Sequence, residues 1–476
     1  MVIRMADGRT AALDYRETAP AAATRNMYVG PDGKLTGGSL IGPLAPAVPS
    51  AVSGLAEALS KWGTMPLREV MAPAIRLAAE GFVVDTGLSS SLEDGKYRIG
   101  SFSGKSTFFP NGKTPQPGER LIQKQLALTL QLIAREGPRA FYEGSIADSI
   151  VAEMKRSGGL ITKADLARYR PIWRTPIRST YRGYSLVTMP PSSSGGTTMT
   201  ESLNILEAYG RAARFGSVER VHALASAFQL AFIDRNSKLG DPAFANLPIG
   251  TLTSKTYARA LARRIRRDRA TPTTGFAARL DQGPETTNYA VVDRFGNAVA
   301  TTTTLNDLYG SGVYVTGAGF FLNNTMDDFT ARPGVANLYG LVQGEVNAIA
   351  PGKRPLSSMS PTIVLDPQSK VLLVTGARGG SRIITATTQV ILNVIDHRMT
   401  LADAMSAPRI HHQALPDSIR VETGGLERGV VERLQAMGHT IYEQAPTSGK
   451  AVSVMRVRGG YQGMDDPRGT GGAAGY

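Results

Sequence analysis

Threonine is concentrated at two places in the second half of the chain, and its hydroxyl is a potential nucleophile. Thr286 and Thr287 begin one stretch with β-like alternation, and the run 301–304 ends the stretch that follows it. A threonine hydroxyl is a weak nucleophile, which a free α-amine on the same residue can activate by acting as a base. Thr286 would gain such an amine only if the chain were cut before it. Because threonine is also a good strand former, a purely structural role is the alternative.

The stretch immediately before Thr286 favours such a cut. Residues 271–285, TPTTGFAARLDQGPE, have neither helical nor strand periodicity and contain several turn formers, so we expect an exposed linker. Attack of the Thr286 hydroxyl on the carbonyl of Glu285 would give an ester, which water could then open. Such a cut would leave Thr286 as a new N-terminus.

Most other catalytic chemistries lack their residues or motifs in this chain. It has no cysteine, which excludes a cysteine nucleophile, thiolate zinc sites and iron–sulfur clusters. The motifs GxSxG, HExxH, GxGxxG and the P-loop are absent. His411 and His412 are adjacent, so on a strand they would point to opposite faces, and we expect structural histidines rather than metal ligands. We therefore expect no metal and no cofactor.

The chain of 476 residues carries a formal net charge of +14, and its densest basic cluster is LARRIRRDRA. Five arginines lie at helical spacings there: Arg263, Arg264, Arg266, Arg267 and Arg269. We expect a solvated basic face rather than a nucleic-acid site, because no aromatic side chains are interleaved with the arginines. No apolar run is long enough for a membrane span, and the start lacks the apolar core of a signal peptide.

The surrounding patterns predict strands and helices in mixed runs. Two hairpins are expected, one turning at Asp7-Gly8 and one at Gly296-Asn297. The strand KVLLVTG should lead through Gly379-Gly380 into a helix. Three stretches with helical spacing are expected to bury an apolar face in the core, namely 52–59, 67–74 and 122–133. Such mixing favours layered sheets under helices rather than strict βαβ alternation.

Several segments, in order and at compatible spacings, resemble the gamma-glutamyltransferase (gamma-glutamyl transpeptidase) family: DYRETAP, TTNYAVVD, TLND, LNNTMDDF, KRPLSSMSPTIV, GARGGSRI, APRIHHQ and the terminal DPR…AAGY. The resemblance implies an α+β fold, a four-layer αββα sandwich of the N-terminal-nucleophile hydrolase type. It also implies one precursor cut into two subunits. Residues 1–285 then resemble the large subunit and residues 286–476 the small one. Thr286 matches the nucleophile, and Thr304 matches the residue whose hydroxyl hydrogen-bonds to it.

The resemblance also assigns the residues that hold a γ-glutamyl group. The α-carboxylate of this group needs a cation and hydroxyls, and its ammonium needs a carboxylate and an amide. Arg16, Ser357 and Ser358 resemble the carboxylate contacts. Asp328 and Asn306 resemble the ammonium contacts.

Two further features of the family cover the reacting carbonyl. Gly379 and Gly380 resemble an oxyanion hole, for which glycine is suited because its backbone N–H can approach without a Cβ in the way. Residues 331–355 resemble a lid loop with Tyr339 as its gate residue. A lid should exclude water and favour an amine acceptor over hydrolysis.

The chain also departs from the family pattern. Thr325 stands where many relatives have Gln or Glu near the ammonium, so this substrate contact should be shortened or lost. Arg378 precedes the glycine pair, where a small residue or Pro is usual. Only MVIRMADGRTAAL precedes DYRETAP, whereas family members carry a secretion signal and the first elements of the large subunit. An incomplete large subunit with an exposed sheet edge and poor stability is the resulting expectation.

The predicted function is therefore a gamma-glutamyltransferase and glutathione hydrolase. It would take the γ-glutamyl group from glutathione or related amides through an ester on Thr286 and pass it to water, an amino acid or a peptide. The resemblance implies a periplasmic or secreted protein. A related acylase for cephalosporin or glutaryl amides is one alternative, and an inactive basic protein that binds polyanions is another.

Overall fold

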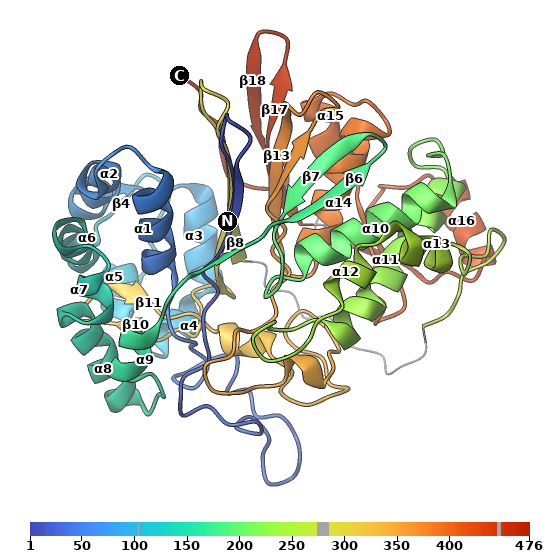
Figure 1. Cartoon of the computed structure of the whole chain (residues 1–476). Helices are drawn as coiled ribbons and strands as arrows, with labels where there is room; N and C mark the ends of the chain where they lie inside the picture. The colour runs from blue at the N-terminus through green and yellow to red at the C-terminus, as the bar shows by residue number, and fades with distance from the viewer. Residues whose placement is uncertain (103, 274–284, 445–448) are drawn as a thin grey trace.

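Two β-sheets lie face to face at the centre of the molecule (Figure 1). The computed structural model describes residues 1–102, 104–273, 285–444 and 449–476. The first sheet has antiparallel strands in the order β5 (Ile172–Arg174), β2 (Thr10–Asp14), β1 (Val2–Arg4), β9 (Ala298–Asn306) and β8 (Glu285–Val292). The second has the order β18 (Gly460–Asp465), β17 (Lys450–Val457), β13 (Val371–Arg378), β12 (Thr362–Leu365), β7 (Tyr184–Thr188) and β6 (Ile177–Tyr181).

The inner faces of the two sheets share an apolar core. Its fully buried members include Val2 and Ala300 from the first sheet and Ile363 and Val374 from the second. Alternation along each strand brings these side chains to the same face, as the period of two requires. Burial at this interface holds the β8–β9 hairpin against β13, and β8 is the strand that carries Thr286.

Helices cover the outer faces and complete four layers. On the second sheet lie α10 (Gly195–Tyr209), α11 (Val218–Lys238), α12 (Ile249–Leu252), α13 (Lys255–Ala262), α14 (Arg382–Ile395), α15 (Leu401–Ser406) and α16 (Arg428–Ala436). The helical lobe beyond the first sheet holds α1 (Ala51–Trp62), α2 (Leu67–Glu80), α3 (Thr86–Asp94), α4 (Lys96–Gly100), α5 (Lys105–Phe108), α6 (Lys124–Glu136), α7 (Arg139–Tyr142), α8 (Ser145–Ser157) and α9 (Lys163–Arg168). The predicted αββα arrangement is confirmed.

Short elements complete the chain outside the two large sheets. The paired strands are β3 (Phe82–Val83) with β4 (Arg120–Leu121), β10 (Tyr314–Val315) with β11 (Phe320–Phe321), and β14 (Ile410–His411) with β15 (Ile419–Glu422) and β16 (Ile441–Gln444). The 3-10 turns are η1 (Pro110–Gly112), η2 (Thr325–Asp328) and η3 (Glu345–Asn347). In the described part of the chain, no helix is both long and apolar enough to cross a membrane.

The predicted hairpins and the predicted strand-to-helix turn are confirmed. Asp7-Gly8 lies between β1 and β2, and Gly296-Asn297 lies between β8 and β9. Gly379-Gly380 joins β13 to α14. These features depend on local turn chemistry, which is why the sequence alone predicts them.

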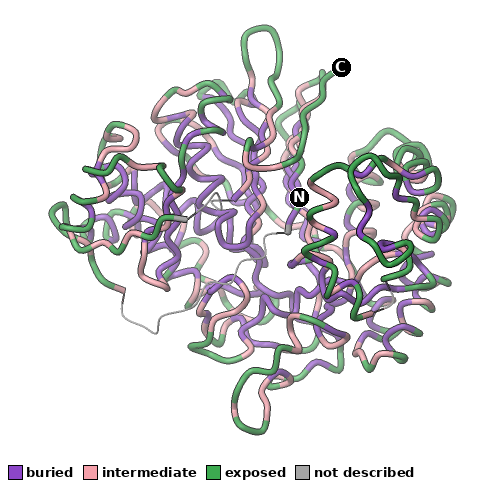
Figure 2. The backbone as a smooth tube through the Cα atoms, turned by 180° about the vertical axis from the view of Figure 1, so that it is seen from behind, coloured by how far each residue is buried: buried purple, intermediate pink, exposed green. Residues whose placement is uncertain are grey.

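The predicted burial of the helix faces is confirmed only in part for α1 and α2, where Val52 and Met71 pack against the core of the lobe but other members of both faces are exposed. Leu55 is 49% exposed and Val70 is 41% exposed, whereas Ile133 on α6 is buried as expected. Figure 2 shows that the outer helices of this lobe alternate between exposed and intermediate positions. The reason is that α1 and α2 form the outside of the lobe, and their fully buried residues are small: Gly54 and Ala58 in α1 and Ala78 in α2.

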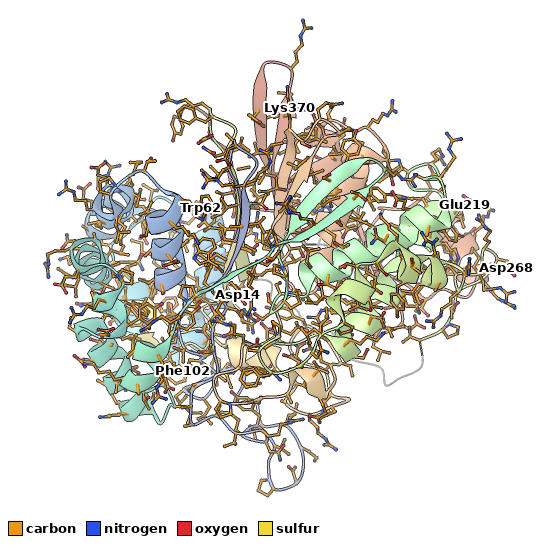
Figure 3. All side chains as sticks on the ribbon, viewed as in Figure 1. Asp14, Trp62, Phe102, Glu219, Asp268 and Lys370 are labelled. Carbon is orange, nitrogen blue, oxygen red and sulfur yellow. The ribbon has the colours of Figure 1, made fainter. Side chains whose placement is uncertain are left out.

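The arginine cluster 263–269 follows the end of α13 at Ala262 instead of continuing the helix. Its arginines are exposed, while Ile265 packs into the core. Figure 3 shows Asp268, a member of the same segment, at the outer surface of the helical layer on the second sheet. The expected exposure of these arginines is confirmed.

Candidate active site

Thr286 and Thr304 face each other across the β8–β9 hairpin. The two residues are register partners, and an irregularity in the pairing falls between Glu285 and Thr286. The Thr286 hydroxyl donates a hydrogen bond to Thr304 Oγ1 at 3.1 Å. Thr304 Oγ1 also accepts the backbone N–H of Asn306 at 2.8 Å. This second bond fixes the side chain of Thr304, so that its oxygen is held toward the Thr286 hydroxyl.

Tyr339 spans the distance between the end of this hairpin and the glycine pair. Its phenolic O–H donates to the carbonyl of Asn306 at 2.5 Å. Its ring packs directly over Gly380, where a Cβ would overlap it. Gln413 Nε2 donates to the Tyr339 carbonyl at 3.1 Å. The residue predicted as the gate is therefore packed against Gly380 and the end of β9, and burial is the main cause that raises its pKa well above the ordinary value.

Gly379 and Gly380 form a tight turn between β13 and α14. Their φ angles are +125° and +58°, a region that favours glycine. Their carbonyls accept the backbone N–H groups of Arg382 and Ile383, which begin α14. Both positions therefore favour glycine for their backbone conformation, and Gly380 needs it also because the Tyr339 ring occupies the space of a Cβ.

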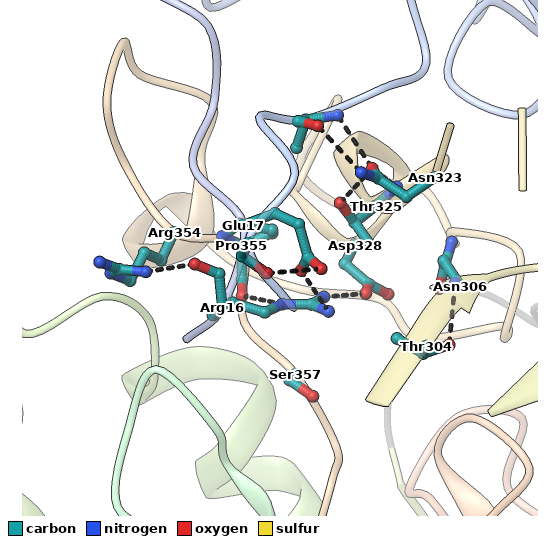
Figure 4. A network of polar contacts seen from close by, with 12 residues as sticks. Arg16, Glu17, Thr304, Asn306, Asn323, Thr325, Asp328, Arg354, Pro355 and Ser357 are labelled. Atoms are coloured by element: carbon teal, nitrogen blue, oxygen red, sulfur yellow. Dashed lines mark hydrogen bonds and ion pairs between the residues drawn. The ribbon is translucent and has the colours of Figure 1, made fainter. Parts of the chain in front are cut away.

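The predicted carboxylate and ammonium contacts lie close together, and two of them, Arg16 and Asp328, bind each other (Figure 4). Arg16 Nη2 forms an ion pair with Asp328 Oδ2, and Arg16 Nη1 lies 3.3 Å from Glu17 Oε2. Burial acts to lower the pKa of Arg16, but these carboxylates reverse the effect and raise it. Burial raises the pKa of Asp328 and of Glu17, and Arg16 opposes the shift in both. In this state the two ends of the expected pocket neutralise one another.

Ser357 and Ser358 are hydrogen-bonded to polar groups that were not predicted from the sequence. The carbonyl of Ser357 accepts both the N–H and the hydroxyl of Ser194, at 2.8 and 2.6 Å. Ser358 Oγ accepts a hydrogen bond from Arg235 Nη2 at 3.1 Å. Arg235 lies on α11, and a charged residue within a helix that is buried over most of its length is the signal that could have identified it.

A small cavity connects three of the predicted residues. Arg16, Thr304 and Ser357 all line it, together with Tyr15 and Glu17. Its volume is about 30 Å³, which is the space of about one water molecule. The cavity as it stands is therefore too small for a glutamyl group.

Three assigned side chains have other partners in this state. Thr325 is fully buried and donates its hydroxyl to Asn323 Oδ1 at 2.7 Å. The side-chain amide of Asn306 donates to the carbonyl of Asn324 at 3.1 Å, although the residue itself adjoins Thr304 (Figure 4). The guanidinium of Arg378 lies beside Gly469, near the end of the chain.

The expected linker lies for the most part outside the described residues, since only 271–273 and the backbone of Glu285 are described. Asp417 Oδ2 accepts the N–H of Thr273 at 2.7 Å, and Gln229 Nε2 donates to the carbonyl of Thr271 at 2.8 Å. The start of the linker is thereby fixed to the second sheet's helical layer.

The two adjacent histidines have structural partners. His411 is bonded to Thr385 and Gln413, and His412 lies 3.2 Å from Asp417. Burial lowers the pKa of His411 well below its ordinary value. Among the described residues, no group of His, Asp and Glu side chains is arranged to hold a metal ion.

Two facing antiparallel sheets under helices, with a threonine hydroxyl pair at the end of the central hairpin, define an N-terminal-nucleophile hydrolase. A sequence profile described as gamma-glutamyltranspeptidase matches residues 1–476. The chain is 44% identical over 479 residues to the glutathione hydrolase proenzyme of Escherichia coli (strain K12), covering 98% of this chain and 82% of that protein. It is 38% identical over 480 residues to the acylase ACY 1 proenzyme of Pseudomonas sp. (strain SE83), covering 98% and 81%.

Solved structures agree with this assignment. Cephalosporin acylase from Bacillus halodurans matches with a TM-score of 0.85 at 27% identity, covering 98% of this chain and 84% of that one. Gamma-glutamyltranspeptidase from Helicobacter pylori matches with a TM-score of 0.56 at 37% identity, covering 57% and 79%. The chain belongs to the gamma-glutamyltranspeptidase family. The resemblance, the fold class and the enzyme class predicted from the sequence are thus confirmed.

Proposed function

We propose that this chain is a precursor that cuts itself before Thr286 and then transfers γ-glutamyl groups from glutathione and similar amides. The cut would give pieces of 285 and 191 residues. The observation that carries the proposal is the hydrogen bond from the Thr286 hydroxyl to Thr304 Oγ1. It orients a hydroxyl at a position where a cut at the end of the linker would also free an α-amine on the same residue.

In the proposed reaction, the freed α-amine of Thr286 removes the proton from its own hydroxyl as Oγ1 attacks the γ-carbonyl carbon. The tetrahedral intermediate carries an oxyanion, which the N–H groups of Gly379 and Gly380 would stabilise. When the intermediate collapses, the C–N bond breaks and the amine product takes the proton. Water or the amine of an acceptor then attacks the ester, and the Thr286 hydroxyl is restored.

The positions of the pocket residues support a donor with two charged ends. Arg16 and the serine pair 357–358 would bind the α-carboxylate, and Asp328 with Asn306 would bind the ammonium. The cavity beside Thr304 is lined by Arg16 and Ser357 as well, two of the proposed carboxylate contacts. Tyr339 would close the site over the donor. By the same resemblance, the proposed location is the periplasm or the outside of the cell.

The proposal is tested by a denaturing gel with N-terminal sequencing of the smaller piece, alongside hydrolysis of γ-glutamyl-4-nitroanilide. We expect the smaller piece to begin Thr-Thr-Asn-Tyr and the Thr286→Ala variant to stay in one piece without activity. Cleavage of Thr286→Ala at the same bond, or full activity of an uncut chain, would falsify the proposal.

An acylase for glutaryl amides is the second candidate, and the similarity to ACY 1 and to cephalosporin acylase favours it. A glutaryl group has the carboxylate but no ammonium. Faster cleavage of glutaryl-4-nitroanilide than of the γ-glutamyl compound would select this reading.

A further inference from the structure

Arg235 is a buried cation without a carboxylate bound to it. It lies on α11 and is 1% exposed. Its guanidinium donates to four neutral oxygens, those of Ser194 (3.0 Å), Asn236 (2.8 Å), Gln343 (3.1 Å) and Ser358 (3.1 Å). Among the described residues, none of its contacts is an ion pair.

A buried charge without a counter-charge is costly to maintain, so a group in this setting needs an anion when the protein works. Burial lowers the pKa of Arg235 to about 10, and the neighbouring Asp328 carboxylate opposes this shift. The guanidinium therefore stays charged at neutral pH. Asp328 is already paired with Arg16, so its negative charge acts on both arginines and belongs to neither alone.

The contacts of Arg235 also fix the direction of one hydroxyl. A guanidinium has donors and no acceptor, so Ser358 Oγ must accept from it. The hydroxyl of a serine has one proton, which then has to be donated elsewhere. Ser358 is the residue next to Ser357, which lines the cavity beside Thr304.

The same guanidinium is also connected to Ser357, through the hydroxyl of Ser194. Ser194 Oγ accepts from Arg235 and passes its own proton to the carbonyl of Ser357 at 2.6 Å. Gln343 Oε1 accepts from Arg235, and Gln343 Nε2 donates to the carbonyl of Asp328 at 3.2 Å. One side chain thus joins α11, the lid segment and the serine pair.

We infer that Arg235 is a positioning residue for the α-carboxylate of the donor: it places a positive charge, which no carboxylate among the described residues contacts directly, behind the pocket, and it turns the Ser358 hydroxyl toward the incoming carboxylate. This inference rests on the proposed function, because it concerns the substrate of the same site. Arg235 acts through Ser358 and has no part in the proton transfers.

The test compares Arg235→Met and Arg235→Lys with wild type and with Arg220→Met. Arg220 is a matched control, because it is also a buried arginine of α11 but is paired with Asp396. The KM and kcat for γ-glutamyl-4-nitroanilide are measured, with L-glutamate and glutarate as competitive inhibitors. Melting temperatures of all variants are recorded alongside.

We expect Arg235→Met to raise KM and both inhibition constants at least tenfold, with kcat changed less than threefold. Arg235→Lys, which keeps the charge but cannot reach Ser194 and Ser358 together, should raise them less. Arg220→Met should lower the melting temperature and leave both inhibition constants within twofold. Where Arg235→Met fails to fold, Arg235→Lys decides alone, and unchanged inhibition constants in it overturn the inference.

A double-mutant cycle with Ser358→Ala tests whether Arg235 affects carboxylate binding through Ser358. If Arg235 acts through Ser358, the second substitution adds little to the first. Independent, multiplicative losses would overturn the positioning role, and so would a fall in kcat at constant KM. Failure of the proposed function is distinguishable, because wild type itself would then not hydrolyse the γ-glutamyl compound.

Discussion

Arg16 and Asp328 form a buried ion pair, although the family resemblance places them at opposite ends of the same substrate group. Each charge compensates the other, which limits the cost of burying both. In the proposed reaction, the donor would replace each partner with one of its own charges as it enters. One ion pair would then give way to two, and a donor with only one charge would leave one of these side chains without a partner.

Asp328→Asn should separate donors by the charge they carry. We expect KM for γ-glutamyl-4-nitroanilide to rise roughly 10- to 100-fold, the range for losing a hydrogen bond to a charged group of about 1.5–3 kcal/mol. Glutaryl-4-nitroanilide should not lose kcat/KM, because Arg16 no longer has to leave Asp328. Equal losses with both substrates would contradict this assignment of Asp328.

Thr304→Ala should slow both the cut and turnover, since it removes the oxygen that accepts from Thr286 and from the N–H of Asn306. We expect at least a tenfold slower appearance of the smaller piece on a time course, while Thr304→Ser stays close to wild type. Thr287→Ala is the control, because Thr287 is exposed on the other face of β8. A Thr304→Ala chain that matures at the normal rate would sink this role for Thr304.

Tyr339→Phe removes the hydrogen bond to the Asn306 carbonyl and keeps the ring over Gly380. A hydrogen bond contributes about 1 kcal/mol, so we expect the closed lid to lose roughly fivefold in stability relative to the open one. More water then reaches the ester. With glycylglycine as acceptor, the ratio of free glutamate to γ-glutamyl product should rise, whereas Tyr314→Phe, remote from the site, should not change it.

Asp327 should make stability depend on pH. It accepts the Ser39 hydroxyl at 2.9 Å and the N–H of Leu338, in the lid segment, at 3.0 Å. Burial is the main cause that raises the pKa of Asp327 to about 7, and Asp328 adds to the shift. The folded state therefore favours the protonated form, and this stability is fully present below about pH 4 and lost as the pH rises through 7.

Asp327→Asn cannot lose a proton and removes this dependence. The melting temperature of the variant, relative to wild type, should increase between pH 5 and pH 8, because each unit of pKa shift corresponds to about 1.4 kcal/mol. A constant difference across that range would show that Asp327 is not protonated in the folded protein.

The parts of the site that come from one local segment were predictable from sequence. The two threonines, their hairpin and the glycine turn each depend on strand alternation and turn chemistry within a few residues. The partners of Arg235 come from positions 194, 343 and 358, and no local pattern connects these segments. The contact of Thr325 could not be predicted either. Its partner Asn323 is only two residues away, but the direction of the Thr325 hydroxyl depends on the turn η2.

Both large sheets combine strands from the two sides of Thr286: β1, β2 and β5 with β8 and β9 in one, and β6 and β7 with β12, β13, β17 and β18 in the other. Once the bond before Thr286 is cut, the two polypeptides are interleaved, and neither can leave without breaking backbone hydrogen bonds in both sheets. Refolding of the uncut chain is unimolecular. Refolding of the cut protein after denaturation would be bimolecular, because two polypeptides have to associate. Recovery from urea should then fall with dilution for the mature enzyme, while the uncut Thr286→Ala chain recovers independently of its concentration.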